Sequence, residues 1–123
     1  MQVLPDALLG DAARMFGMLA DESRLRLLRA LHEAGELGVG DLASRAGLSL
    51  ANTSQHLNRM AAAGLVARRR DGKNVLYRIG DPRVEELCRL VCHGLRERAQ
   101  ERWDRQVNGA AAADGVAGAS HGR

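Results

Sequence analysis

Residues 38–79, GVGDLASRAGLSLANTSQHLNRMAAAGLVARRRDGKNVLYRI, decide the fold of this chain. A helical pattern over residues 41–46 ends at Gly47, because glycine readily takes the left-handed conformation that terminates helices. Ser49 can then cap a second helix by accepting a hydrogen bond from an otherwise unpaired backbone N–H. That helix runs to Gly64, which ends it in the same way. Two helices joined by a short turn that contains glycine are typical of a helix-turn-helix.

A basic β-hairpin is expected directly after the second helix. The segments 65–70 (LVARRR) and 74–79 (NVLYRI) flank Asp71-Gly72, a dipeptide that favours tight hairpin turns. In the second segment, β-branched and aromatic residues recur at every second position, as in a strand with one better-buried face. With the two helices, this hairpin predicts a mainly α fold with a small β-hairpin, the winged helix-turn-helix. The cations of the hairpin are Arg68, Arg69, Arg70, Lys73 and Arg78.

The second helix has a polar face that suits a DNA groove. At 100° per residue, Asn52, Gln55, His56 and Arg59 lie opposite the apolar side of the helix, which we expect to include Leu50, Leu57 and Ala61. Asparagine and glutamine can bond adenine bidentately, arginine can bond guanine, and cations on a wing can lie over phosphates. The candidate DNA-contacting residues are Ser49, Asn52, Thr53, Ser54, Gln55, His56, Arg59, Arg68, Arg69, Arg70 and Lys73.

Length and composition set limits on the rest of the chain. Its 123 residues are enough for one domain and too few for two full cores. We expect a single DNA-binding and dimerisation domain over residues 1–107, followed by a disordered Ala/Gly-rich tail over residues 108–123. The net charge is only +3, so DNA affinity depends on where the cations lie. No apolar run is long enough to span a membrane, which predicts a cytoplasmic protein with reduced cysteines.

Two further helical regions flank the central segment. A helical pattern covers residues 7–19, and Asp21 caps the next helix, in which Leu25, Leu28 and Leu31 are expected to be buried. After the hairpin, Asp81-Pro82 opens a long helix that runs to about residue 106. Its apolar stripe could pack within the domain, but its length favours pairing of the terminal helices across a two-fold axis, giving a homodimer that reads two half-sites. The stripe consists of Val84, Cys88, Val91 and Leu95.

Over roughly residues 8–106 the chain resembles the ArsR/SmtB family of bacterial repressors. The run LADESRLRLLRAL resembles the second helix of that family, and GELGVGDLASRAGLSLANTSQHLNRMAAAGLVARRRDGKNVLYRI resembles its helix-turn-helix and wing. The resemblance implies a homodimer that binds double-stranded operator DNA and leaves it when an inducer binds. The run ANTSQHL is most similar to members that are found with sulfur-handling enzymes.

The family's familiar sensing sites are missing from this sequence. Gly38 and Gly40 stand where arsenic, cadmium or lead sensors carry a Cys-x-Cys motif. In the last helix Asp81 remains, but Arg83 and Gly94 replace histidines that zinc, nickel or cobalt sensors use. Asp81 and Glu97 alone are poor zinc ligands.

Two cysteines remain as a candidate sensor. Cys88 and Cys92 lie one helical turn apart and could share a soft metal or metalloid ion, or react with oxidants or reactive sulfur. Cysteine is also a common small core residue, so a structural role stays open. The chain would then be a constitutive or partner-regulated repressor. The other alternative is a winged-helix protein-interaction module without DNA binding. No pattern of catalytic residues predicts an enzyme.

Overall fold

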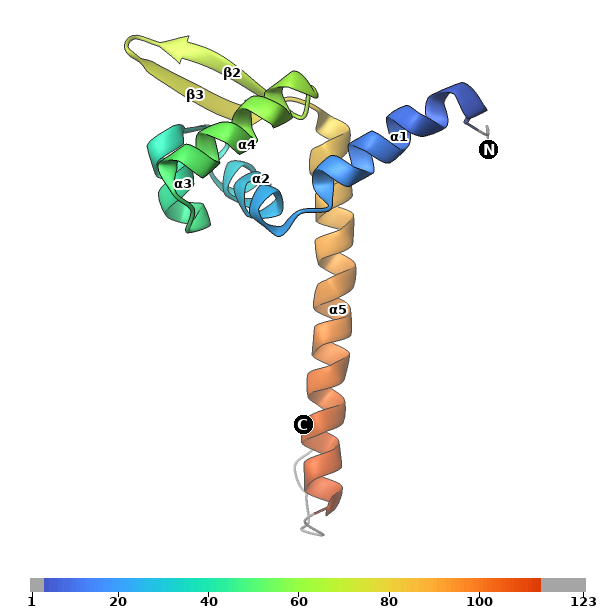
Figure 1. Ribbon diagram of the computed structural model, residues 1–123. Helices are drawn as coiled ribbons and strands as arrows, with labels where there is room; N and C mark the ends of the chain where they lie inside the picture. The colour runs from blue at the N-terminus through green and yellow to red at the C-terminus, as the bar shows by residue number, and fades with distance from the viewer. Residues whose placement is uncertain (1–3, 114–123) are drawn as a thin grey trace. The chain divides into compact units, whose positions relative to one another are not determined.

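The computed structural model describes residues 4–113 as five helices and a small antiparallel sheet (Figure 1). The chain divides after Glu85 into two compact units, the first from the N-terminus and the second formed by the rest of the chain. The elements are α1 (Asp6–Leu19), α2 (Glu22–Ala34), β1 (Leu37–Gly38), α3 (Val39–Ala46), α4 (Leu50–Ala62), β2 (Val66–Asp71), β3 (Asn74–Ile79) and α5 (Pro82–Ala113).

The core of the first unit lies where α3 packs against α2 and α4, and where these three helices pack against the sheet. Leu25 and Leu50, which the sequence pattern places in the core, are instead 44% and 57% exposed. Leu25 is exposed because the buried side of α2 is centred on Leu27 and Leu31, and Leu50 because it is the first residue of α4. The largest wholly buried side chains are Leu27, Leu28, Leu31, Leu42, Leu57, Met60, Leu65, Val84 and Thr53.

The predicted helix boundaries around the central turn are confirmed. The Asp21 side chain accepts a hydrogen bond from the Arg24 backbone N–H at 2.9 Å and caps α2. Gly47 ends α3 in the left-handed conformation, with φ +69°, and its N–H donates to the Ser44 carbonyl. Ser49 caps α4 two residues later. The chain therefore makes a tight turn between α3 and α4, which fixes the helix-turn-helix.

The sheet has three strands in the order β1-β3-β2, all antiparallel. The two-residue strand β1 is too short for a sequence pattern to reveal it, and it joins the sheet where Leu37 pairs with Tyr77. The hairpin loop is Gly72-Lys73, one residue later than the predicted Asp71-Gly72, because Asp71 pairs with Asn74. A glycine with φ +64° at the first loop position is typical of a type II′ turn. The β2–β3 hairpin extends past the helices of its unit (Figure 1).

The last helix is longer than the sequence predicts. α5 continues to Ala113, so residues 108–113 are helical rather than part of the expected tail, because alanines favour a helix that is already formed. The remaining predicted tail, residues 114–123, lies outside the described residues. None of the helices in the described part of the chain is long and apolar enough to cross a membrane.

Candidate nucleic-acid interface

The first turn of α4 is fixed by the Ser49 residue in front of it. The Ser49 hydroxyl accepts the Asn52 backbone N–H at 3.1 Å. The Ser49 carbonyl accepts both the Thr53 backbone N–H at 3.0 Å and the Thr53 hydroxyl at 2.8 Å. The sequence pattern predicts that Thr53 contacts DNA. Thr53 is wholly buried, however, so its side chain is not available to DNA. Ser49 is exposed, but its hydroxyl is already used as a helix cap.

The exposed side of α4 retains three of the predicted DNA-contacting residues. Asn52, Gln55 and Arg59 are all exposed, while Ser54 is half-buried. Asn58 is also exposed on this helix, and sequence reasoning missed it. Its spacing of three residues from Gln55 places it one turn further along the same face, which is the signal that could have found it.

His56 is partly covered by the fold instead of lying on the exposed side of α4. It is half-buried, and its Nδ1 atom is buried without a hydrogen-bond partner among the described residues. The Arg24 N–H holds the pKa of Asp21 below its usual range, and the charges of Arg24 and His56 lower it further. The partial burial of His56 makes it a poor candidate for base reading. The periodicity of 100° per residue did not predict the burial of His56, because the buried side of α4 is wider than expected.

The two faces of the wing carry different arginines. Residues that pair across the hairpin share a face, and Arg68 pairs with the buried Tyr77 while Arg70 pairs with Val75. Arg68 also contacts α4, because its guanidinium donates to Asn58 Oδ1 at 3.3 Å. Arg68 and Arg70 are thus on the side of the sheet that faces α4.

Arg69 points to the opposite face and is already engaged. Its Nε and Nη2 atoms each donate to a carboxylate oxygen of Glu36 at 2.7 Å. This bidentate bond holds the pKa of Glu36 below its usual range and raises that of Arg69. The charge of Arg78 acts on Glu36 in the same direction. The predicted phosphate contact at Arg69 therefore competes with an internal carboxylate that the sequence pattern did not reveal.

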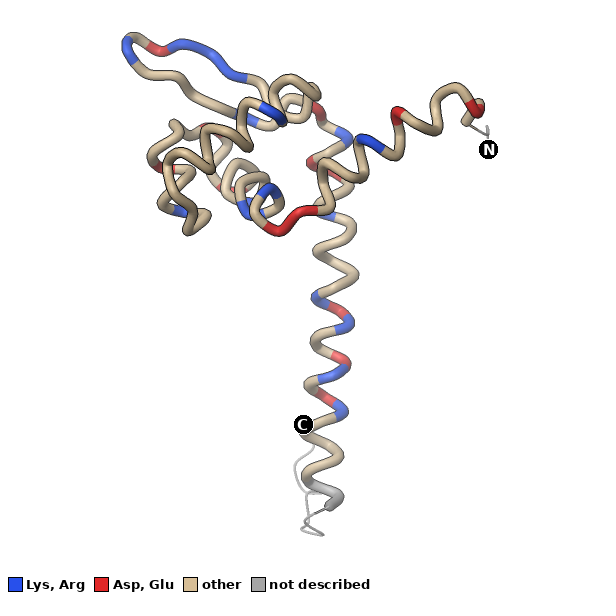
Figure 2. Tube along the Cα trace, viewed as in Figure 1, with Lys and Arg blue, Asp and Glu red and all other residues tan. Residues whose placement is uncertain are grey.

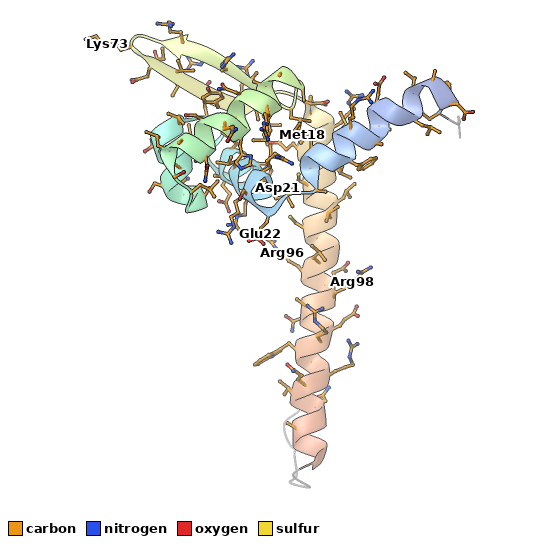
Figure 3. All side chains as sticks on the ribbon, in the orientation of Figure 1. Met18, Asp21, Glu22, Lys73, Arg96 and Arg98 are labelled. Atoms are coloured by element: carbon orange, nitrogen blue, oxygen red, sulfur yellow. The ribbon has the colours of Figure 1, made fainter. Side chains whose placement is uncertain are left out.

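The wing presents most of its positive charge along β2 and at its tip. Figure 2 shows the cations of β2 as one continuous stretch. Lys73 lies at the tip, where its side chain projects away from the unit (Figure 3). Arg68, Arg70 and Lys73 are all exposed, so each can approach a phosphate.

The two cysteines lie in the second unit, on α5. Cys92 is exposed and Cys88 is half-buried, and both are free thiols. Burial raises the pKa of the Cys88 thiol, and the neighbouring Cys92 adds to this effect. In the described part of the chain, no three histidine, cysteine or acidic side chains gather to hold a metal ion.

Comparisons with known proteins agree with this geometry. The helix-turn-helix domain family matches residues 19–69, from the end of α1 through most of β2. The transcriptional repressor SmtB homolog of Synechocystis is 40% identical over 78% of this chain and 75% of its own length. The chain belongs to the ArsR/SmtB family of DNA-binding transcriptional repressors.

Solved structures of this family share the fold. The chain is similar to the antimony-specific transcriptional repressor AntR, with a TM-score of 0.74 and 35% identity over 81% of this chain and 90% of AntR. It is also similar to a homodimeric winged helix-turn-helix domain from Mycobacterium bovis, a possible ArsR-family regulator, with a TM-score of 0.70 and 33% identity over 82% of this chain and 95% of that domain. The chain spans 62 to 64% of the length of three further curated relatives.

Proposed function

We propose that this ArsR/SmtB-family protein is a homodimeric repressor that binds double-stranded operator DNA through α4 and the wing. The observation that carries the proposal is the exposed polar side of α4, fixed by the Ser49 cap, beside a wing face with two exposed arginines, Arg68 and Arg70. A helix of this kind fits the major groove, and its N-terminal residues contact base edges. Asn52, Gln55 and Arg59 would read bases, while Arg68, Arg70 and Lys73 would bind phosphates.

The homodimer is supported by apolar side chains that stay exposed on the terminal helices. Leu8, Leu9 and Phe16 of α1 are 45 to 60% exposed, as are Val91 and Leu95 of α5, at 52 and 55%. Such a density of large apolar groups is typical of a protein interface. The similar domain from Mycobacterium bovis is homodimeric, and two copies would present two recognition helices to successive half-sites.

A mobility-shift titration on the promoter region next to the chain's own gene tests the DNA-binding proposal. We expect binding at low salt that weakens linearly on a log–log plot as salt rises, because bound cations release counterions. The double variant Asn52→Ala/Gln55→Ala should lose preference for the operator over unrelated DNA while keeping most of the salt dependence. An absence of binding at low salt would overturn the proposal and favour a protein-interaction module.

We further propose that Cys88 and Cys92 release the repressor from DNA when a thiol-reactive inducer binds. The inducer could be a soft metal ion, a metalloid, an oxidant or reactive sulfur, all of which react with paired thiolates. One similar repressor, AntR, is antimony-specific, which supports a metalloid. The two thiols lie at i and i+4 on one helix, which suits a shared ion.

Release of bound operator tests this sensor. Antimonite, arsenite, Hg²⁺, hydrogen peroxide and polysulfide should be titrated separately into the complex of the wild type and of Cys88→Ser/Cys92→Ser. We expect at least one of them to dissociate only the wild-type complex. Equal release of both proteins, or release of neither, would remove the cysteines from the mechanism and favour a constitutive or partner-regulated repressor.

A further inference from the structure

Leu50 is an apolar side chain that the described part of the chain leaves mostly exposed. It is the first residue of α4 and is 57% exposed, whereas the helix buries Thr53, Leu57 and Met60 almost wholly. An apolar side chain left in water at the start of a recognition helix costs hydration free energy that contact with a ligand would recover.

The backbone beneath Leu50 is held in place. Ser49 caps the helix on one side of it, and the hydrogen bonds from Asn52 and Thr53 to Ser49 close the first turn around it. Side chains in a helix tilt toward its N-terminus, so Leu50 projects toward and past the start of α4. The N-terminal residues of a recognition helix are the ones that contact base edges.

The groups exposed around Leu50 also limit what this end of the helix can read. Ala51, Asn52 and Gln55 are exposed in the same two turns, Ser54 and His56 are half-buried, and the exposed Ser49 hydroxyl is used as the helix cap. The freely exposed groups are therefore methyl groups and amides, with no lysine, arginine or carboxylate among them. In the major groove the apolar group on a base edge is the C5-methyl of thymine. The adenine paired with that thymine presents the donor and acceptor that an asparagine or glutamine amide bonds.

We propose that Leu50 contacts a thymine methyl group in each operator half-site and so selects an A·T pair at that position. The proposal rests on the proposed DNA-binding function and names the base feature that its recognition helix detects. Leu50 would act by van der Waals contact and methyl burial, without a hydrogen bond. Asn52 or Gln55 would be free to bond the adenine of the same or the neighbouring pair.

Deoxyuridine substitution tests this contact, because uracil differs from thymine only by that methyl group. Each thymine of the operator half-sites, located first by footprinting, would be replaced in turn, and the Kd measured for wild type, Leu50→Ala and Leu25→Ala. For wild type we expect a roughly three- to five-fold loss of affinity per half-site at one or two positions, the size expected for one buried methyl group. Leu50→Ala should bind the thymine and uracil operators equally.

Leu25→Ala is the matched control, because Leu25 is another exposed leucine, at 44%, and lies on α2. The Leu25→Ala variant should discriminate between the thymine and uracil operators as strongly as the wild type does. If wild type binds every uracil operator as tightly as the thymine operator, the proposal is overturned while DNA binding stands. It is overturned as well if Leu50→Ala keeps the full discrimination, since DNA shape would then be the cause. Failure to bind the thymine operator at all would instead reject the proposed function.

Discussion

At the scale of single residues, two adjacent arginines of the wing should behave differently. Arg70 lies with Arg68 on the face of the hairpin that is turned toward α4, whereas Arg69 is bound to Glu36 on the other face. Arg70→Ala should weaken binding to operator and unrelated DNA alike and reduce the slope of log K against log salt by about 1. Arg69→Ala should change that slope by clearly less. The measurement is a Kd series over salt for both variants, and equal slopes would contradict the assignment of faces.

The two thiols should also differ at this scale. Cys92 is exposed, while burial raises the pKa of Cys88, so less of Cys88 is thiolate at neutral pH. Iodoacetamide should therefore modify Cys92 first, because the thiolate is the nucleophile. Raising the pH increases the thiolate fraction of Cys88 and should narrow the difference. Peptide mass spectrometry of time points at two pH values measures the modification rate of each cysteine. Faster modification of Cys88 than of Cys92 at neutral pH would contradict the burial argument.

At the scale of elements, the cap of α4 can be separated from any DNA contact by Ser49. Ser49→Ala removes the acceptor of the Asn52 N–H and should lower the free energy of unfolding by about 1 kcal/mol. Ser49→Asn should restore most of it, because asparagine caps helices as well as serine does. Urea unfolding of the three proteins is the measurement. Full stability of Ser49→Ala would show that the cap is dispensable.

Most of the elements could be predicted from the sequence because their signals are local. Asp21, Gly47 and Ser49 mark helix ends through bonds to residues within a few positions of themselves. The strand β1 could not be predicted, since its two residues become a strand only by pairing with β3. The end of α5 was missed because alanine-rich sequence is compatible with both a tail and a continuing helix.

The candidate site was predicted less completely, because whether a side chain is available to DNA depends on its contacts with residues distant in sequence. The polar pattern of α4 identified Asn52, Gln55 and Arg59, but it could not show that Thr53 is buried. Nor could it show that Arg69 meets Glu36, since that bond joins residues 33 positions apart and depends on the register of the sheet. Composition and spacing identify side chains of the right chemistry, and the tertiary fold decides which of them are free.

At the scale of the whole molecule, the proposed homodimer predicts a strong effect of one substitution on α5. Leu95→Glu would place a charge in the apolar stripe, where burial without a partner is costly, and should give a monomer. Operator affinity should fall at least ten-fold, because a monomer reads one half-site. Leu90→Glu, on a different side of α5, is the control and should remain a dimer. Sedimentation equilibrium measures the oligomeric state of both variants. A dimeric Leu95→Glu variant would place the interface elsewhere.

The bond between Glu36 and Arg69 has a consequence for the search through a genome. A cation over phosphates strengthens binding to every stretch of DNA, and competing sites number about 10⁶ to 10⁹. If the wing binds DNA as proposed, Glu36 would limit attraction to DNA that carries no operator, because it occupies Arg69 on the far face of the wing. Under the proposed function, more protein would then stay free to find its operator.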